Sequence, residues 1–209
     1  TRGCKAVGIS LSGEQIEYSR RYTSGLGVEI VKCDYRDLPE RFAPASFDKI
    51  LVCGMLEHVG HKNYRTYMKK AAECLKPGGL FLVQTIASNT TSACTDPWIS
   101  KYIFPNSLLP SARHLSEASE GLLVIEDWHS FGPDYDKTLM AWHHNFNTAW
   151  EELAERYGDR FGRMWNYYLT SCAAAFEAVY EDQWIREPAA RRRASSDRPQ
   201  PAEPYPRRE

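Results

Sequence analysis

Several signatures that would define a class of protein are missing from this sequence. It has no GxGxxG and no GxxxxGK[ST] motif, which argues against a nucleotide held by its phosphates. Its six cysteines include no CxxC pair, so we expect neither a zinc site nor a disulfide framework, and a reducing, cytosolic setting is favoured. No apolar run approaches the roughly 20 residues that span a bilayer, and no signal peptide is visible. The net charge is only -1, so no global field recruits nucleic acid or an anionic membrane.

What is present is enough for one domain with a substantial core. The chain has 209 residues, of which 43% are hydrophobic. We expect this domain to cover residues 1–186, and residues 187–209, which are rich in arginine and proline, to form a disordered tail. Because the chain begins with Thr1 rather than Met and reaches a predicted strand within a few residues, we also expect that it is a fragment without its start.

The stretch from Phe47 to Gly60 places a carboxylate directly after a predicted strand. The unbroken apolar run at 50–53 is typical of a strand covered on both faces, as in a parallel sheet, and Gly54 ends it. In open α/β sheets, ligands bind just beyond the carboxyl ends of such strands, which is where Glu57 lies. The alternative is structural: Glu57 caps the next helix or pairs with a lysine on the surface.

Apolar patterning predicts alternating strands and helices up to residue 86. Strands are predicted at 5–9, 29–32, 50–53 and 80–86, helices at 12–24 and 64–75, and a loop at 39–46. Ser12 and Gln15 have capping-box spacing at the first helix, and the Lys76-Pro77-Gly78-Gly79 segment should end the second. This alternation favours right-handed crossovers and a parallel sheet.

The pattern changes after residue 96. Residues 96–111 are rich in aromatic residues and proline and have no clean period, and a further strand is predicted at 122–128. Two helices with wide aromatic stripes follow, the first carrying Leu139 to Leu153 and the second Phe161 to Phe176. These stripes favour ordinary helix packing, and a cavity for a long apolar ligand is the alternative.

Several segments together resemble a known family. They are GISLSGEQ, DYRDLPERF, FDKILVCGMLEHVG, DPWISKYIFPNSLLPS, EDWHSFGPDYDKTLMAWHHNF and MWNYYLTSCAAAF, in order between about Ala6 and Ala178. The chain resembles the cyclopropane-fatty-acyl-phospholipid synthases and the related mycolic acid cyclopropane synthases. The resemblance implies an α/β, Rossmann-like class I methyltransferase sheet, mostly parallel, with added helices. The family's first strand and glycine-rich loop would be missing here, which would expose the edges of the two strands that flank that strand.

The resemblance also implies roles for particular residues, and it implies no metal. The positions that match the binding site of the cofactor S-adenosylmethionine are Ser10, Leu11, Gln15, Tyr35 and Arg36. The positions that match the catalytic site are Glu57, Gln84, Ile86, Tyr135 and Cys172. In the family, Glu57, the Ile86 backbone and Tyr135 would hold a bicarbonate ion that acts as base. Gln84 departs from the histidine of the bacterial phospholipid enzymes, since an amide can donate a hydrogen bond but cannot carry a proton.

The activity implied is transfer of a methyl group to the double bond of an unsaturated phospholipid acyl chain, with proton loss to close a cyclopropane ring. The aromatic faces of Trp98, Tyr102 and Tyr135 could stabilise the positive charge formed on the chain. Implied partners are acyl chains at the inner membrane surface, reached from the cytoplasm; a homodimer is compatible, and no nucleic acid is expected. The aromatic segment 98–109 is a candidate for the membrane contact, and the favoured alternative is that it packs over the acyl pocket. The alternatives are a related methyltransferase that forms a methyl branch and a non-catalytic fragment.

Overall fold

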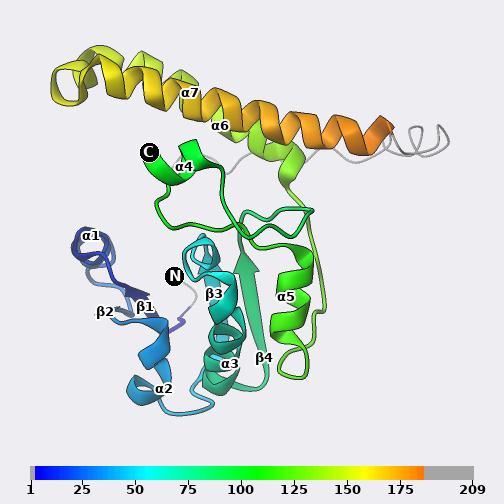
Figure 1. Cartoon of the computed structure of the whole chain (residues 1–209). Helices are drawn as coiled ribbons and strands as arrows, with labels where there is room; N and C mark the ends of the chain where they lie inside the picture. The colour runs from blue at the N-terminus through cyan, green and yellow to red at the C-terminus, as the bar shows by residue number, and fades with distance from the viewer. Residues whose placement is uncertain (1–2, 186–209) are drawn as a thin grey trace. The chain divides into compact units, whose positions relative to one another are not determined.

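The computed structural model describes residues 3–185, and the chain divides into two compact units, Thr1–Asp127 and Trp128–Glu209 (Figure 1). The predicted tail at 187–209 lies outside the described residues. Each unit is built around its own core, and each is described by itself.

Two separate pairs of parallel strands organise the first unit. β1 (Ala6–Ser10) pairs with β2 (Val28–Lys32), and β3 (Phe47–Cys53) pairs with β4 (Leu75–Gln84). Over residues 3–185, no strand joins the two pairs, so β1 and β3 have one strand neighbour each.

Local sequence explains the connection from β1 to β2. The Ser12 hydroxyl accepts a hydrogen bond from the Gln15 backbone N–H at 3.2 Å, which caps α1 (Gly13–Tyr22) as predicted. The predicted loop at 39–46 is wrong at its start. After β2, a 3₁₀ turn (Tyr35–Asp37) leads into the short helix α2 (Leu38–Arg41), because Pro39 in the first turn is compatible with a helix start.

The core of the first unit lies between α3 (Tyr64–Cys74) and one face of the β3–β4 pair (Figure 1). The predicted stripe is confirmed, since Tyr64, Tyr67, Met68 and Ala71 are all buried. The helix ends earlier than expected. Leu75 already has extended dihedral angles and pairs with Phe47, so the segment predicted to end the helix belongs to β4 instead.

The other face of the β3–β4 pair is open, which corrects the prediction that this strand is covered on both faces. Leu51 is 72% exposed, and its neighbours Leu80 and Leu82 are 56% and 55% exposed. The reason is that α3 and the cluster around it pack on the opposite face, against Val52 and Phe81.

The segment between the sheet and the second unit departs most from the sequence-based expectation. It contains two short helices, α4 (Pro97–Tyr102) and α5 (Ala112–Ser119), and α5 packs on α3. The strand predicted at 122–128 is not formed. Leu122 and Leu123 pack on the core, but no strand of the described residues pairs with this segment, and Val124 is 83% exposed.

The second unit is a pair of helices, α6 (Gly132–Thr148) and α7 (Trp150–Ile185). Gly158 has a φ of +74° and interrupts α7, a conformation that favours glycine. The first helix is shorter than its predicted stripe, so Leu153 belongs to α7. Leu139 and Leu169 are fully buried between the aromatic side chains. Among residues 3–185, no helix combines the length and the apolar character needed to cross a membrane.

Candidate functional site

Glu57 is carried into the core by a sharp turn at the end of β3. Gly54 has a φ of +62°, a conformation that favours glycine, and it turns the chain off the strand. The following 3₁₀ turn (Leu56–His58) buries Leu56 completely and leaves Glu57 only 7% exposed. The backbone carbonyl of Glu57 accepts a hydrogen bond from the Leu108 N–H at 2.8 Å, which fixes the turn. Glu57 is therefore neither a helix cap nor a surface ion-pair partner.

The carboxylate of Glu57 has one satisfied oxygen and one oxygen without a protein partner. Its Oε1 accepts a hydrogen bond from the Ile86 backbone N–H at 2.7 Å. Ile86 follows β4, so the carboxyl ends of two neighbouring parallel strands meet here. Its Oε2 is buried and has no hydrogen-bond partner among the described residues. Leaving such an atom unpaired costs about 1–3 kcal/mol, and more when it is charged, so this oxygen is suited to a ligand that donates a hydrogen bond.

The bond from Ile86 changes one predicted role. The resemblance implies that this N–H holds the bicarbonate ion, but in the structure it holds the Glu57 side chain. A single N–H makes one good hydrogen bond at a time, so its contribution here is to orient Glu57.

Two buried tyrosines of α3 experience the negative charge of Glu57. Burial, and then the charge of Glu57, raises the pKa of Tyr64 to about 12. The same two causes, in the same order, raise the pKa of Tyr67 further. Both phenols therefore stay protonated at neutral pH. The Tyr64 hydroxyl donates to the Leu108 carbonyl at 3.3 Å, whereas the Tyr67 hydroxyl is buried without a partner among the described residues.

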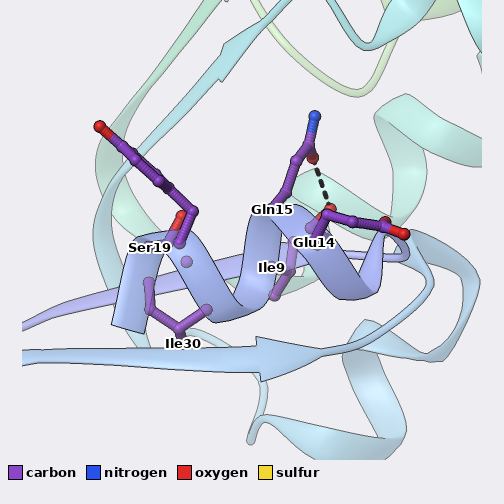
Figure 2. Close-up of a pocket in the computed structure, with 8 residues that line it drawn as sticks. Ile9, Glu14, Gln15, Ser19 and Ile30 are labelled. Carbon is purple, nitrogen blue, oxygen red and sulfur yellow. Dashed lines mark hydrogen bonds between the residues drawn. The ribbon is translucent and has the colours of Figure 1, made fainter. Parts of the chain in front are cut away.

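The predicted cofactor residues that follow β1 lie together. The Ser10 hydroxyl donates to the Gln15 Oε1 at 2.8 Å and accepts from the Ser12 N–H at 3.1 Å, while Leu11 is 60% exposed. Ser10 and Gln15 also line a surface pocket of about 410 Å³ between α1 and β1. Figure 2 shows Gln15 on the α1 side of this pocket, with the dashed line of its bond to Ser10.

The predicted cofactor residues that follow β2 are held by neighbours on both sides. Arg36 donates to the Asp34 carboxylate from Nε at 2.9 Å and from Nη2 at 2.6 Å. These bonds hold the pKa of Asp34 below its usual value. The ring of Tyr35 meets the ring of Tyr67 edge-on at 5.2 Å, and burial raises the pKa of Tyr35. Tyr67 thus contacts the predicted cofactor residue Tyr35 and experiences the charge of Glu57.

The remaining predicted site residues of the second unit form their own cluster. The Tyr135 ring packs edge-on against Phe176 at 4.9 Å, and Cys172 lies on the same helix as Phe176. Burial raises the pKa of Tyr168 to about 12, with smaller contributions from Cys172 and Tyr135. Tyr168, Cys172 and Phe176 are spaced four residues apart along α7, so they share one face of that helix, and Cys172 is only partly buried.

Gln84 lies at the end of β4, on the open face of the sheet. Its Oε1 accepts a hydrogen bond from the Cys53 thiol at 2.9 Å, across the β3–β4 pair. Among residues 3–185, no group of three His, Cys, Asp or Glu side chains is placed to hold a metal ion.

Sequence reasoning missed the roles of Tyr67 and Asp34. Tyr67 was predicted only as a member of a core stripe, and Asp34 was not considered. The available signal was chemical: a tyrosine at a fully core-facing helix position carries a hydroxyl that needs a partner, and Asp34 directly precedes the Tyr35-Arg36 pair.

Comparisons with known proteins identify the family of this chain. The sequence model of the family described as mycolic acid cyclopropane synthetase matches residues 1–185. The chain belongs to this family. It is 51% identical over 178 residues to the cyclopropane-fatty-acyl-phospholipid synthase of Escherichia coli K12, which covers 85% of this chain and 45% of that protein. It is 33% identical over 202 residues to the tuberculostearic acid methyltransferase UfaA1 of Mycobacterium tuberculosis, covering 89% of this chain and 46% of that protein.

Structural similarity identifies the fold. The cyclopropane synthase MmaA2 of Mycobacterium tuberculosis superimposes with a TM-score of 0.71 at 22% identity, covering 82% of this chain and 65% of that chain. The fold is therefore the α/β fold of the class I methyltransferases. The chain spans a little under half the length of the curated relatives it matches.

Proposed function

We propose that this chain is the part of a cyclopropane-fatty-acyl-phospholipid synthase that supplies the base-holding carboxylate. The protein would transfer a methyl group from S-adenosylmethionine to the double bond of an unsaturated phospholipid acyl chain, with loss of a proton to close the ring. The observation that carries this proposal is Glu57, a buried carboxylate at the ends of two parallel strands with one oxygen left for a ligand.

The residues present fit the two groups that this reaction needs. When bound, S-adenosylmethionine would supply an electrophilic methyl group and bicarbonate would supply a base. S-adenosylmethionine would be held by residues at and beyond the ends of β1 and β2, namely Ser10, Gln15, Tyr35 and Arg36. The unpartnered Oε2 of Glu57 would accept the O–H of bicarbonate.

The chain's own residues prepare Glu57 for this role. The Ile86 N–H fixes the carboxylate from one side, so it does not rotate when a ligand binds. Two anions repel, so the ion also needs hydrogen-bond donors, and we assign this role to the Tyr135 hydroxyl. Cys172 lies beside Tyr168 on a partly buried helix face, and we assign it a packing role.

The proposal extends to location and assembly. The acyl chains belong to a membrane lipid, so the protein would act from the cytoplasm at the inner membrane surface, as a monomer or a homodimer. The amphipathic α4, in which the Trp98 and Tyr102 rings lie 5.5 Å apart, is the segment that we assign to this contact.

A second candidate is a methyltransferase that leaves a methyl branch instead of a ring. Gln84 favours this second candidate, because its amide cannot carry a proton. The amide oxygen also accepts a hydrogen bond from the Cys53 thiol. The 33% identity to a relative named as a tuberculostearic acid methyltransferase is compatible with it.

One assay separates these activities. Residues 1–185 replace the matching segment of the Escherichia coli synthase, and the chimera is given vesicles of unsaturated phospholipid and methyl-labelled S-adenosylmethionine. Labelled cyclopropane chains are the result that we expect, and labelled methyl-branched chains would support the second candidate. Vesicles of saturated phospholipid are the control. If the chimera is folded and labels no acyl chain, the proposed function is wrong and the chain is a non-catalytic fragment.

A further inference from the structure

Among the described residues of the first unit, two buried side-chain polar atoms have no hydrogen-bond partner. They are Oε2 of Glu57 and the hydroxyl oxygen of Tyr67. Both residues are more than nine-tenths buried, with Glu57 7% and Tyr67 4% exposed. A buried polar group without a partner destabilises the fold, so a fold that keeps two of them calls for an explanation.

Tyr67 and two near neighbours of Glu57 in the chain belong to the same core cluster. They are Leu56, the first residue of the turn that carries Glu57, and Val59, which follows that turn. The charge of Glu57 is close enough to raise the pKa of Tyr67. A charged acceptor, which follows the end of β3, and a phenol on α3 that can donate are therefore both buried beside the same core cluster.

We infer that Tyr67 is a positioning residue for Glu57. Its hydroxyl donates a hydrogen bond to one bridging water molecule, and that water donates to Oε2 of Glu57. The two side chains make no direct hydrogen bond, and a buried water needs two or more polar partners, which these atoms provide. This inference deepens the proposed function and rests on it for its catalytic meaning. The apolar stripe on α3 predicts only a packing role for Tyr67.

Tyr67 also contacts a residue of the predicted cofactor site. Its ring meets Tyr35 edge-on, and Tyr35 follows β2 at the predicted cofactor site. The side chain thus contacts the residues that follow β2 and β3. Tyr67 would fix the carboxylate relative to the bound cofactor, which matters because a small displacement of a catalytic group lowers the rate strongly.

The first test uses the 209-residue chain and does not depend on catalysis. The midpoints of urea unfolding are measured for Tyr67→Phe, Glu57→Gln and the double variant. We expect the shift of the double variant to differ from the sum of the single shifts, because the bridge is lost only once. Tyr64→Phe, on the same helix, is the matched control. Its hydroxyl has its own partner in the Leu108 carbonyl, so its shift should add to that of Glu57→Gln. Additive shifts for Tyr67 would overturn the inference.

The second test uses the chimera with the Escherichia coli synthase. Tyr67→Phe should raise the bicarbonate concentration for half-maximal rate roughly tenfold, and leave the KM for S-adenosylmethionine within about twofold. A purely structural role would not separate these two constants. If Glu57→Gln keeps the parental rate, the proposed function fails. If Glu57→Gln is slow but Tyr67→Phe leaves the bicarbonate requirement unchanged, only the inference about Tyr67 fails.

Discussion

Replacing Glu57 by Gln should separate catalysis from stability. The substitution keeps the shape of the side chain and an oxygen that can accept the Ile86 N–H, which now donates to Oε1 at 2.7 Å. It removes the negative charge and places an NH₂ group at the position of one of the two carboxylate oxygens, which we expect to be the unpartnered Oε2. The ligand's O–H would then meet a neutral group that accepts poorly or does not accept at all.

The size of the effect follows from the hydrogen bond that is lost. A hydrogen bond to a charged group contributes about 1.5–3 kcal/mol, and each 1.4 kcal/mol changes a rate about tenfold. The chimera that carries Glu57→Gln should therefore form product about 10- to 150-fold more slowly. Stability should stay equal or rise, because the variant no longer buries an incompletely paired charge in a site that is only 7% exposed.

The assay is the initial rate of label transfer to acyl chains, measured beside urea unfolding of the same variants. Glu117→Gln is the matched control, since Glu117 pairs on the surface with Arg113 at 2.7 Å and its loss should leave the rate unchanged. A Glu57→Gln variant with the parental rate would refute the reasoning. A slow variant whose unfolding midpoint also falls strongly would show that the residue acts through the fold.

Three further predictions concern the 209-residue chain. Calorimetry should detect no micromolar binding of S-adenosylmethionine, because no strand of the described residues joins the β1–β2 pair to the β3–β4 pair; micromolar affinity would contradict this. Asp34→Asn should lower the free energy of unfolding at neutral pH by about 1 kcal/mol or less. Arg36 lowers the folded-state pKa of Asp34, so this difference should disappear as the pH falls through that value; a difference that persists in acid would be evidence against the ion pair. Leu139→Ala, at a fully buried position, should destabilise the second unit by about 2–5 kcal/mol in urea unfolding, and a change under 1 kcal/mol would exclude a packed core there.

The sequence predicts well those elements whose local and long-range signals agree. β3 is marked by an apolar run, ended by a glycine and followed by Glu57, and the structure confirms the strand and its end at Gly54. The burial of the Glu57 carboxylate is an additional finding of the structure. α1 is marked by its cap at Ser12. In both cases the residues that mark the element lie within a few positions of each other, and for β3 the partner strand β4 is also present.

Elements that depend on distant partners were predicted poorly. Residues 122–128 have the composition of a strand, but a strand needs a neighbour, and none of the described residues provides one. The apolar run in β3 gave no indication that one face would stay open, because periodicity does not say what covers a face. The role of Tyr67 depends on its position relative to Glu57 and Tyr35, which only the fold supplies.

The most direct test of the proposed site is a crystal structure of the chimera with S-adenosylhomocysteine and bicarbonate. The account predicts one bicarbonate ion that contacts both Oε2 of Glu57 and the hydroxyl of Tyr135. An ion bound elsewhere, or Glu57 and Tyr135 lining separate cavities too far apart to share one ligand, would contradict it.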